Sequence, residues 1–390
     1  MNRRLTLLPS LASVVLLVAA CGADSGGGGA EGEPIKIGFF SPTTGATSAD
    51  GVNARNGAEL ATEKCNKEGI DGRNVELVTY DDAGDPAQAV TIARRLVQQD
   101  GAVGVVSGAY SPPTTAAAPI FQQAQVPMLS AYAVSPKITD AGDYIFRAGP
   151  AGQVEGSASA LFIAEELPGD PMRVSVLAGD LDPLIVLSTA MKERAAQEGL
   201  EIVSDDKFAL SDTDFRPLLG RAAAANPDVI YAAAFYDQTA QLLSQAKELG
   251  VTAPFVFGSS SDSYKVFELA GDAAEGSYLT TDFDRSDRPV VQEFITEFQS
   301  RYESPPDIVA AASYDAVLAM CKAFESAEST EGPEVLAAIN GFENLDELVT
   351  GPVSEVTSER DFARPLSLQI AKGGEWTSFA QLSWEEVTGG

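Results

Sequence analysis

Residues 103–136 combine hydroxyl groups, small side chains and two predicted strand ends, a combination suited to binding a small anion. The β-branched run 103–106 predicts a buried strand, and Ser107-Gly108 supplies the small residues of a tight turn. A helix is then expected, with Ser111 as its N-cap and Pro112 at its first position. Free N–H groups at a helix start attract anions, and a charge-assisted hydrogen bond contributes roughly 1.5–3 kcal/mol.

A second strand, 126–130, and a loop of small residues, 131–136, follow this helix. The two strand ends would deliver hydroxyls and backbone amides to one crevice, so this stretch is the predicted ligand site. The alternative is that Ser111 only caps a helix.

The first 34 residues predict export and membrane anchoring. Residues 1–20 carry two arginines and then an apolar run too short to span a membrane, which is typical of a signal peptide. Leu17-Val18-Ala19-Ala20-Cys21-Gly22 resembles a bacterial lipobox, so Cys21 is expected to be the lipidated mature N-terminus. The glycine-rich segment 21–34 predicts a flexible tether. The alternative is a soluble exported protein cleaved nearby.

Composition excludes several functions. The chain has 26 Lys+Arg against 56 Asp+Glu, a formal charge of -30, which makes nucleic acid an unsuitable partner. It contains no histidine, so a Ser-His-Asp hydrolase or a zinc site is not expected. We therefore predict no catalytic residues, no metal and no cofactor.

From residue 35 the chain alternates between strand and helix patterns, which predicts an α/β fold with parallel sheets. Length and 45% hydrophobic residues suit two domains with proper cores. The expected arrangement is two doubly wound lobes that hold the ligand between their strand ends. The predicted strands are 35–40, 75–80, 103–106, 126–130, 173–178, 228–233 and 254–258; the predicted helices are 53–66, 86–99, 111–123, 190–197, 238–248, 264–269 and 314–324.

A series of short motifs resembles the branched-chain amino acid (Leu/Ile/Val) type I periplasmic-binding proteins, the substrate-binding components of ABC importers. The order and spacing of the motifs carry the resemblance, which covers nearly the whole mature chain. They are Ile35-Lys36-Ile37-Gly38, Gly45, 56–61, Asn66, 69–73, Asp81-Asp82, Asp85-Pro86, Ala89-Val90, Ser111, Pro119, Val126-Pro127, Pro136, Phe146-Arg147, 271–276 and 314–317.

The resemblance implies a chain that crosses between the lobes three times, near Arg147, Asp282 and Arg364. The N-terminal lobe would then contain 35–147 and 283–364, and the C-terminal lobe 148–282 and 365–390. Ligand would close the lobes like a hinge, and the membrane permease would recognise the closed, monomeric form.

The resemblance also assigns site residues. Ser111 matches the serine that binds the ligand carboxylate, with Tyr110 before it, and the ligand loop corresponds to Tyr132, Ala133 and Val134. Val134 stands where the family has a threonine, Asp50 where it has an aromatic residue, and Asp182 or Pro183 where it has a tyrosine. Phe235 and Tyr236 match an aromatic wall. Asp262 is the nearest acid to the position that neutralises an ammonium, or alternatively an N-cap.

Cys65 and Cys321 lie on helices that the family fold places in one lobe, so a disulfide is expected in the oxidising compartment. The alternative is two free buried thiols.

Three functional classes follow: a lipid-anchored importer receptor, a ligand-binding sensor for aromatic carboxylates or small amides, and an enzyme. The missing histidine and the scattered acids disfavour the enzyme, and the lack of a later apolar span disfavours the sensor. The departures at Val134, Asp50 and Pro183 predict that the ligand is not a plain aliphatic amino acid bound in the family's usual manner.

Overall fold

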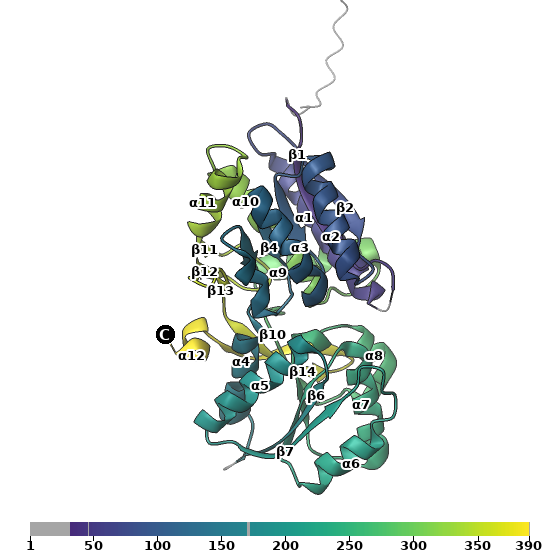
Figure 1. The fold of residues 1–390 in the computed structure, drawn as a ribbon. Helices are drawn as coiled ribbons and strands as arrows, with labels where there is room; N and C mark the ends of the chain where they lie inside the picture. The colour runs from purple at the N-terminus through teal and green to yellow at the C-terminus, as the bar shows by residue number, and fades with distance from the viewer. Residues whose placement is uncertain (1–31, 46, 170–171, 390) are drawn as a thin grey trace, which may run out of the picture.

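Two separate β-sheets, each covered by helices, form two lobes joined by thin connecting segments (Figure 1). The computed structural model describes residues 32–45, 47–169 and 172–389. The predicted signal peptide, Cys21 and nearly all of the predicted tether lie outside the described residues.

The N-terminal lobe is built on a five-stranded parallel sheet with the order β2-β1-β3-β4-β5. Its strands are β1 (Ile35–Ser41), β2 (Val75–Asp81), β3 (Gly104–Ser107), β4 (Met128–Ser130) and β5 (Ile145–Arg147). Its helices are α1 (Ser48–Glu68), α2 (Pro86–Arg95), a π-turn (Leu96–Asp100), α3 (Ser111–Ala124), a 3-10 turn (Pro136–Ala141), α9 (Pro289–Tyr302), α10 (Ile308–Ser326) and α11 (Gly332–Asn340).

Side chains of β1 alternate between two cores, as expected for a strand buried on both faces. Ile37 and Phe39 pack with residues of α1 and α10, whereas Phe40 packs on the other face with residues of α2 and α3. Helix α2 begins as predicted, because Asp85 caps it by accepting hydrogen bonds from the amides of Ala87 and Gln88 at 2.7 and 3.3 Å.

The C-terminal lobe has a seven-stranded sheet with the order β15-β14-β10-β9-β8-β6-β7. Its strands are β6 (Arg173–Gly179), β7 (Glu201–Phe208), β8 (Val229–Ala233), β9 (Phe255–Phe257), β10 (Tyr278–Thr281), β14 (Leu366–Lys372) and β15 (Glu375–Leu382). Its helices are α4 (Gly152–Glu166), α5 (Asp182–Gln197), α6 (Arg216–Ala224), α7 (Tyr236–Leu249), α8 (Lys265–Ala270), α12 (Trp384–Thr388) and 3-10 turns at Ser259–Ser261 and Gly271–Ala273.

The two sheets share one strand order although their sequences show no repeat. In chain order, the five parallel strands β6 to β10 follow the same 2-1-3-4-5 arrangement as β1 to β5. The predicted α/β fold with two doubly wound lobes is therefore confirmed. Strands β14 and β15 add an antiparallel edge to the second sheet, beyond the expected parallel strands.

The chain passes between the sheets three times, after β5, after β10 and before β14. A small antiparallel sheet lies before the last passage and comprises β11 (Glu343–Leu345), β12 (Val353–Val356) and β13 (Phe362–Ala363). The lobe boundaries 35–147 with 283–364, and 148–282 with 365–390, stay a prediction.

Two predicted N-caps are wrong. Tyr110 holds the N-cap position of α3, so Ser111 is the first helical residue and Pro112 the second. The Ser111 hydroxyl oxygen instead accepts a hydrogen bond from the Ser135 amide at 3.2 Å. Tyr264 holds the N-cap position of α8, so Asp262 does not cap that helix.

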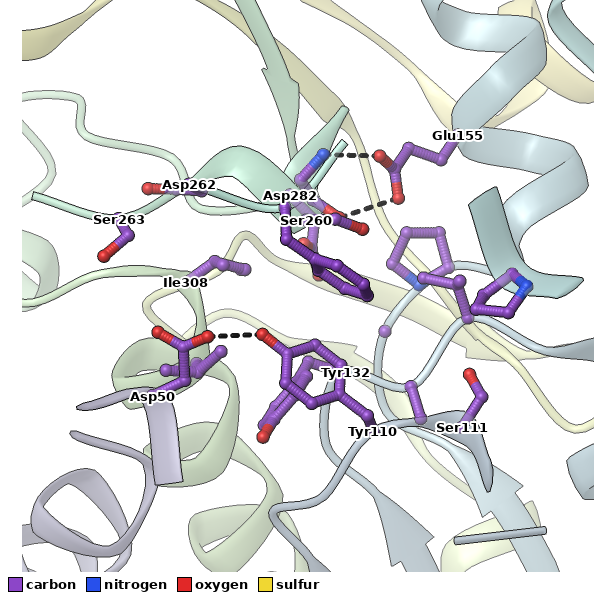
Figure 2. A pocket seen from close by; sticks show the side chains of 18 of the residues that line it. Asp50, Tyr110, Ser111, Tyr132, Glu155, Ser260, Asp262, Ser263, Asp282 and Ile308 are labelled. Carbon is purple, nitrogen blue, oxygen red and sulfur yellow. Dashed lines mark hydrogen bonds between the residues drawn. The ribbon is translucent and has the colours of Figure 1, made fainter. Parts of the chain in front are cut away.

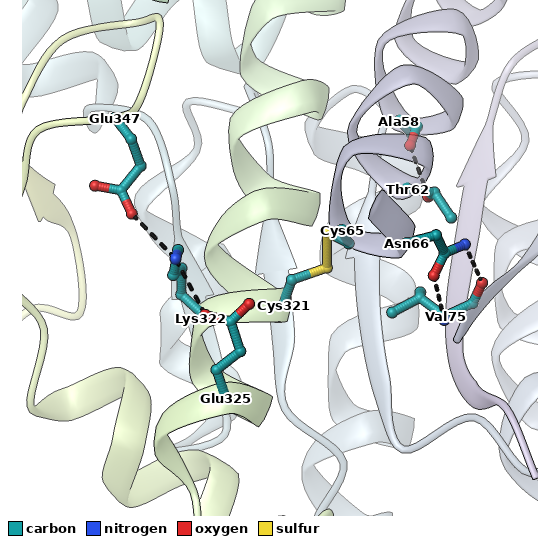
Figure 3. The surroundings of a disulfide bond; sticks show 9 residues. All are labelled: Ala58, Thr62, Cys65, Asn66, Val75, Cys321, Lys322, Glu325 and Glu347. Atoms are coloured by element: carbon teal, nitrogen blue, oxygen red, sulfur yellow. Dashed lines mark hydrogen bonds and ion pairs between the residues drawn. A yellow bond between two sulfur atoms is a disulfide. The ribbon is translucent and has the colours of Figure 1, made fainter. Parts of the chain in front are cut away.

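Cys65 of α1 and Cys321 of α10 are joined by a disulfide in the structure, with their Cα atoms 6.4 Å apart (Figure 3). The bond links residues 256 positions apart and ties the beginning of the N-terminal lobe to the segment that returns to it after β10. These two thiols are therefore not free in this structure.

Candidate ligand-binding site

A cavity lies between the two lobes, where the carboxyl ends of both sets of parallel strands face one another (Figure 2). It encloses ≈ 680 Å³ including the solvent at its mouth, a volume typical of a small-molecule site. The lining residues are Asp50, Tyr110, Ser111, Pro112, Tyr132, Ala133, Val134, Gly149, Pro150, Glu155, Leu181, Pro183, Phe235, Ser259, Ser260, Asp262, Ser263, Asp282, Ile308 and Val309.

Three aromatic rings form one wall and connect the lobes. Tyr110 packs edge-on against Tyr132 and Phe235, with ring centroids 5.5 and 5.2 Å apart. Phe235 follows β8 of the C-terminal lobe, whereas both tyrosines follow strands of the N-terminal lobe. The hydroxyl of Tyr132 donates to the Gly108 carbonyl at 2.7 Å, and that of Tyr110 donates to Asp50. Burial raises the pKa of both tyrosines well above its ordinary value, so both hydroxyls stay protonated.

Two buried carboxyls face the cavity from opposite lobes. Burial raises the pKa of Asp50 to about 6, although its hydrogen bond from Tyr110 opposes this shift. Burial raises the pKa of Glu155 to about 7, against hydrogen bonds from the Ser259 amide at 2.6 Å and its hydroxyl at 2.8 Å. Figure 2 shows these contacts as dashed lines.

Asp262 forms a two-pronged ion pair with Arg285. The guanidinium donates from Nη2 to Oδ1 at 2.5 Å and from Nη1 to Oδ2 at 3.0 Å, and Thr281 donates to Oδ2 at 2.9 Å. The Asp262 side chain has no exposed surface and that of Arg285 only 12%. The acid predicted to neutralise a ligand ammonium is therefore already neutralised within the protein.

The carboxylate of Asp282 accepts fewer side-chain hydrogen bonds than those of the other lining acids. It follows β10 directly and is 4% exposed. The nearest cationic atom that the structure describes is Nη1 of Arg364, 3.9 Å from Oδ2, and the same atom lies 3.8 Å from Asp315. Burial raises the pKa of Asp282 to about 6 despite this guanidinium.

The structure brings most predicted site residues together. Seven of them line the cavity: Tyr110, Ser111, Tyr132, Ala133, Val134, Phe235 and Asp262. Tyr236 does not, because α7 begins there and its ring packs with the core of the C-terminal lobe. Asp182 does not either, because its carboxylate pairs with Lys137 at 2.6 Å and its side chain is 61% exposed.

Sequence reasoning missed Glu155, Asp282 and the serines at 259, 260 and 263. One local signal existed for Glu155, the only charged residue within 152–163, a stretch of small and apolar residues that forms a buried helix. No local signal marked Asp282, because its place in the cavity depends on where the chain leaves β10.

Within residues 32–45, 47–169 and 172–389, no three His, Cys, Asp or Glu side chains group as a metal site. In the same part of the chain, no helix combines the length and apolar character needed to cross a membrane.

Two doubly wound lobes around a small-molecule cavity define the class of two-lobed solute-binding proteins. A family model described as "Periplasmic binding protein" matches residues 34–375. The chain belongs to this family, in its branched-chain amino acid (Leu/Ile/Val) type I group, as the sequence motifs predicted.

Among its relatives, the leucine-, isoleucine-, valine-, threonine- and alanine-binding protein of Pseudomonas aeruginosa is 30% identical over 321 residues, 82% of this chain and 85% of that protein. The Leu/Ile/Val-binding protein of Escherichia coli is 26% identical over 77% of this chain and 82% of its own.

Solved structures agree on the fold. A leucine-binding protein from Thermotoga maritima superposes with a TM-score of 0.82 at 26% identity, covering 90% of this chain and 99% of its own. An ABC-transporter solute-binding protein from Rhodopseudomonas palustris, in complex with 3,4-dihydroxybenzoic acid, superposes with a TM-score of 0.81 at 24% identity. The superposition covers 90% of this chain and 97% of that protein.

Proposed function

We propose that this chain is the extracytoplasmic solute receptor of an ABC importer, anchored to the cell membrane through lipidated Cys21. It captures a small solute between its lobes and, as a monomer, delivers it to the membrane permease. The resemblance suggests an amino acid or similar small carboxylate. No enzymatic step is proposed.

The observation that carries this proposal is the cavity lined by both lobes. The rings of Tyr110 and Phe235 meet across the cavity, with centroids 5.2 Å apart. Lys137 of one lobe and Asp182 of the other form an exposed ion pair at 2.6 Å. The Gly152 amide also donates to the Val134 carbonyl at 2.9 Å. A ligand that contacts both walls would bind the closed form far better than an open one.

Closure driven by ligand has a definite energetic requirement. Shifting the ratio of closed to open molecules from 1:99 to 99:1 requires the ligand to bind the closed form about 5.5 kcal/mol more favourably than the open form. Three aromatic rings and several polar groups line the cavity from both lobes, and a ligand that contacts them in the closed form could supply this difference.

A sensor for aromatic carboxylates or small amides is the second candidate, and the aromatic wall favours a ligand with flat apolar surface. Against a free aromatic carboxylate, the described lining contains no lysine or arginine.

Native mass spectrometry of the freshly purified full chain tests capture of a solute. The expected result is an additional small-molecule mass that is lost on unfolding. The control is Ser260→Trp, which places an indole in the cavity and should abolish the extra mass while the protein stays folded. Equal retention in both proteins would contradict the proposed site.

A further inference from the structure

The cavity lining contains an excess of acidic over basic side chains. Four of its lining side chains are carboxyls, those of Asp50, Glu155, Asp262 and Asp282, and the described lining includes no basic side chain. Among the residues that the structure describes, only Arg285 and Arg364 form ion pairs with these acids, and Arg364 also pairs with Asp315. A buried carboxylate without full compensation is costly, so this arrangement favours a cation that completes it.

Three of the four acids already have hydrogen-bond donors. Asp50 accepts from Tyr110, Glu155 accepts twice from Ser259, and Asp262 accepts from Arg285 and Thr281. Asp282 is the exception. Although more than nine-tenths of it is buried, no described side chain donates a hydrogen bond to its carboxylate, and the Arg364 guanidinium stops at 3.9 Å.

A glycine, Gly149, lies beside the Asp282 carboxylate. A Cβ added at Gly149, which also lines the cavity, would lie 3.4 Å from Oδ2 of Asp282. Residue 149 therefore places no side chain beside this carboxylate, and both residues line the same cavity, where a ligand group could approach the acid.

Charged donors for a ligand carboxylate are absent from the described lining, which offers neutral groups such as the hydroxyls of Ser111, Ser260 and Ser263. Pro112 and Pro113, the second and third residues of α3, supply no amide hydrogen at the helix start. The Ser135 amide already donates to Ser111, and both tyrosine hydroxyls are committed elsewhere. A cation instead meets the Asp282 carboxylate, which accepts no described side-chain hydrogen bond, and the rings of Tyr110, Tyr132 and Phe235, which attract cations through their faces.

We propose that Asp282 is the counter-ion of the ligand, and that the ligand carries an ammonium-type cation on an apolar body and no free carboxylate. This inference rests on the proposed solute-binding function, but its ligand class differs from the amino acid or small carboxylate that the resemblance suggests. It also moves the charge-recognising role from Asp262, which Arg285 occupies, to Asp282, which stands where the chain returns from β10 to the N-terminal lobe.

The test uses two matched series of probes in calorimetric titrations of the purified full chain. Each series contains an amino acid, the amine that lacks its carboxylate and the acid that lacks its ammonium: leucine, 3-methylbutylamine and 4-methylpentanoate; phenylalanine, phenethylamine and 3-phenylpropanoate. We expect at least one amine to bind at least tenfold tighter than both of its partners. Tighter binding of the amino acids or acids, or no binding of either amine, would overturn the proposal.

Asp282→Asn keeps the side-chain shape but removes the charge, and it should weaken amine binding about ten- to a hundred-fold, the loss expected for one charge-assisted contact. The control Asp143→Asn removes a carboxylate whose side chain is 84% exposed, and amine binding should not change. Unchanged amine affinity in folded Asp282→Asn would refute the role of Asp282. If leucine binds best and both variants match the wild type, solute binding stands and only this inference fails.

Discussion

Arg285 donates hydrogen bonds to Asp262 from both terminal nitrogens of its guanidinium, Nη2 and Nη1, at 2.5 and 3.0 Å. The same side chain donates to Gln369 of β14 at 2.6 Å and lies over the ring of Phe283, with 4.3 Å from its central carbon to the ring centroid. One arginine therefore joins the loop after β9, the passage after β10 and the antiparallel edge of the second sheet. Its role is structural, because it holds the lobe connection together.

Arg285→Met should lower the free energy of unfolding by about 3–5 kcal/mol, because it leaves the buried charge of Asp262 without its partner. The double variant Arg285→Met/Asp262→Asn should recover much of this loss. Urea denaturation of both variants and the wild type measures the effect. A single variant as stable as the wild type would show that the ion pair contributes little.

Ser111→Ala separates the two ligand classes. If the ligand is a cation, Ser111 contributes a neutral hydrogen bond at most, so affinity for phenethylamine should fall by less than about tenfold. Stability should fall by about 0.5–1.5 kcal/mol, because the Ser135 amide loses its acceptor. Ser326→Ala, at the exposed end of α10, is the control. A hundred-fold loss for any ligand would indicate that Ser111 binds a carboxylate after all.

Glu155→Gln should remove part of the pH dependence of stability. Burial raises the pKa of Glu155 to about 7, so its favourable contribution is complete below its ordinary value near 4.5 and is lost as the pH rises through 7. The wild type should lose up to about 1.4 kcal/mol per pH unit across this window relative to the variant. Thermal or urea unfolding from pH 4.5 to pH 8 checks this, and parallel curves for the two proteins would contradict it.

The disulfide between Cys65 and Cys321 should leave no alkylatable thiol at either position in unreduced, denatured protein. Its removal in Cys65→Ser/Cys321→Ser should lower stability by several kcal/mol, commonly about 2–4, because the closed loop is long. Mass spectrometry after alkylation counts the thiols. Two modified thiols in the wild type would show that the bond does not form.

Cys21 should carry the acyl chains. Bacteria that express the full chain and are fed an alkyne fatty acid should label it, and Cys21→Ser should abolish both the label and retention in the membrane fraction, because lipid chains supply the attachment. A labelled Cys21→Ser variant would place the lipid elsewhere, and an unlabelled wild type would indicate a released protein.

Much of the fold could be predicted because its signals are local. Asp85 with Pro86 predicted the start of α2, and the β-branched run before Ser107 predicted β3. The position of Ser111 was harder, since Tyr110 takes the extended conformation of the N-cap although its side chain cannot cap. Which residue takes the N-cap position depends here on packing, because the Tyr110 ring lies between Tyr132 and Phe235.

The site was predicted more completely in the N-terminal lobe than in the C-terminal lobe, where only Phe235 and Asp262 were correctly placed in the described lining. Residues 110–134 sit on two consecutive strand ends, so sequence order brings them together. Asp282 and Arg285 join them through a chain passage more than a hundred residues later, and nothing local distinguishes them from other charged residues. Phe235 and Tyr236 show the same limit, because the start of α7 points one ring to the cavity and the other to the core.

Solute capture by closure of the two lobes is most directly tested by small-angle X-ray scattering of the same protein with and without its solute. The purified chain is measured first, and again after unfolding in urea, dialysis and refolding to strip the bound molecule. The predicted result is a larger radius of gyration for the stripped protein, and a return to the smaller value when the released molecule is added back. An identical radius of gyration in all three samples, with a bound mass present in the first, would contradict the account.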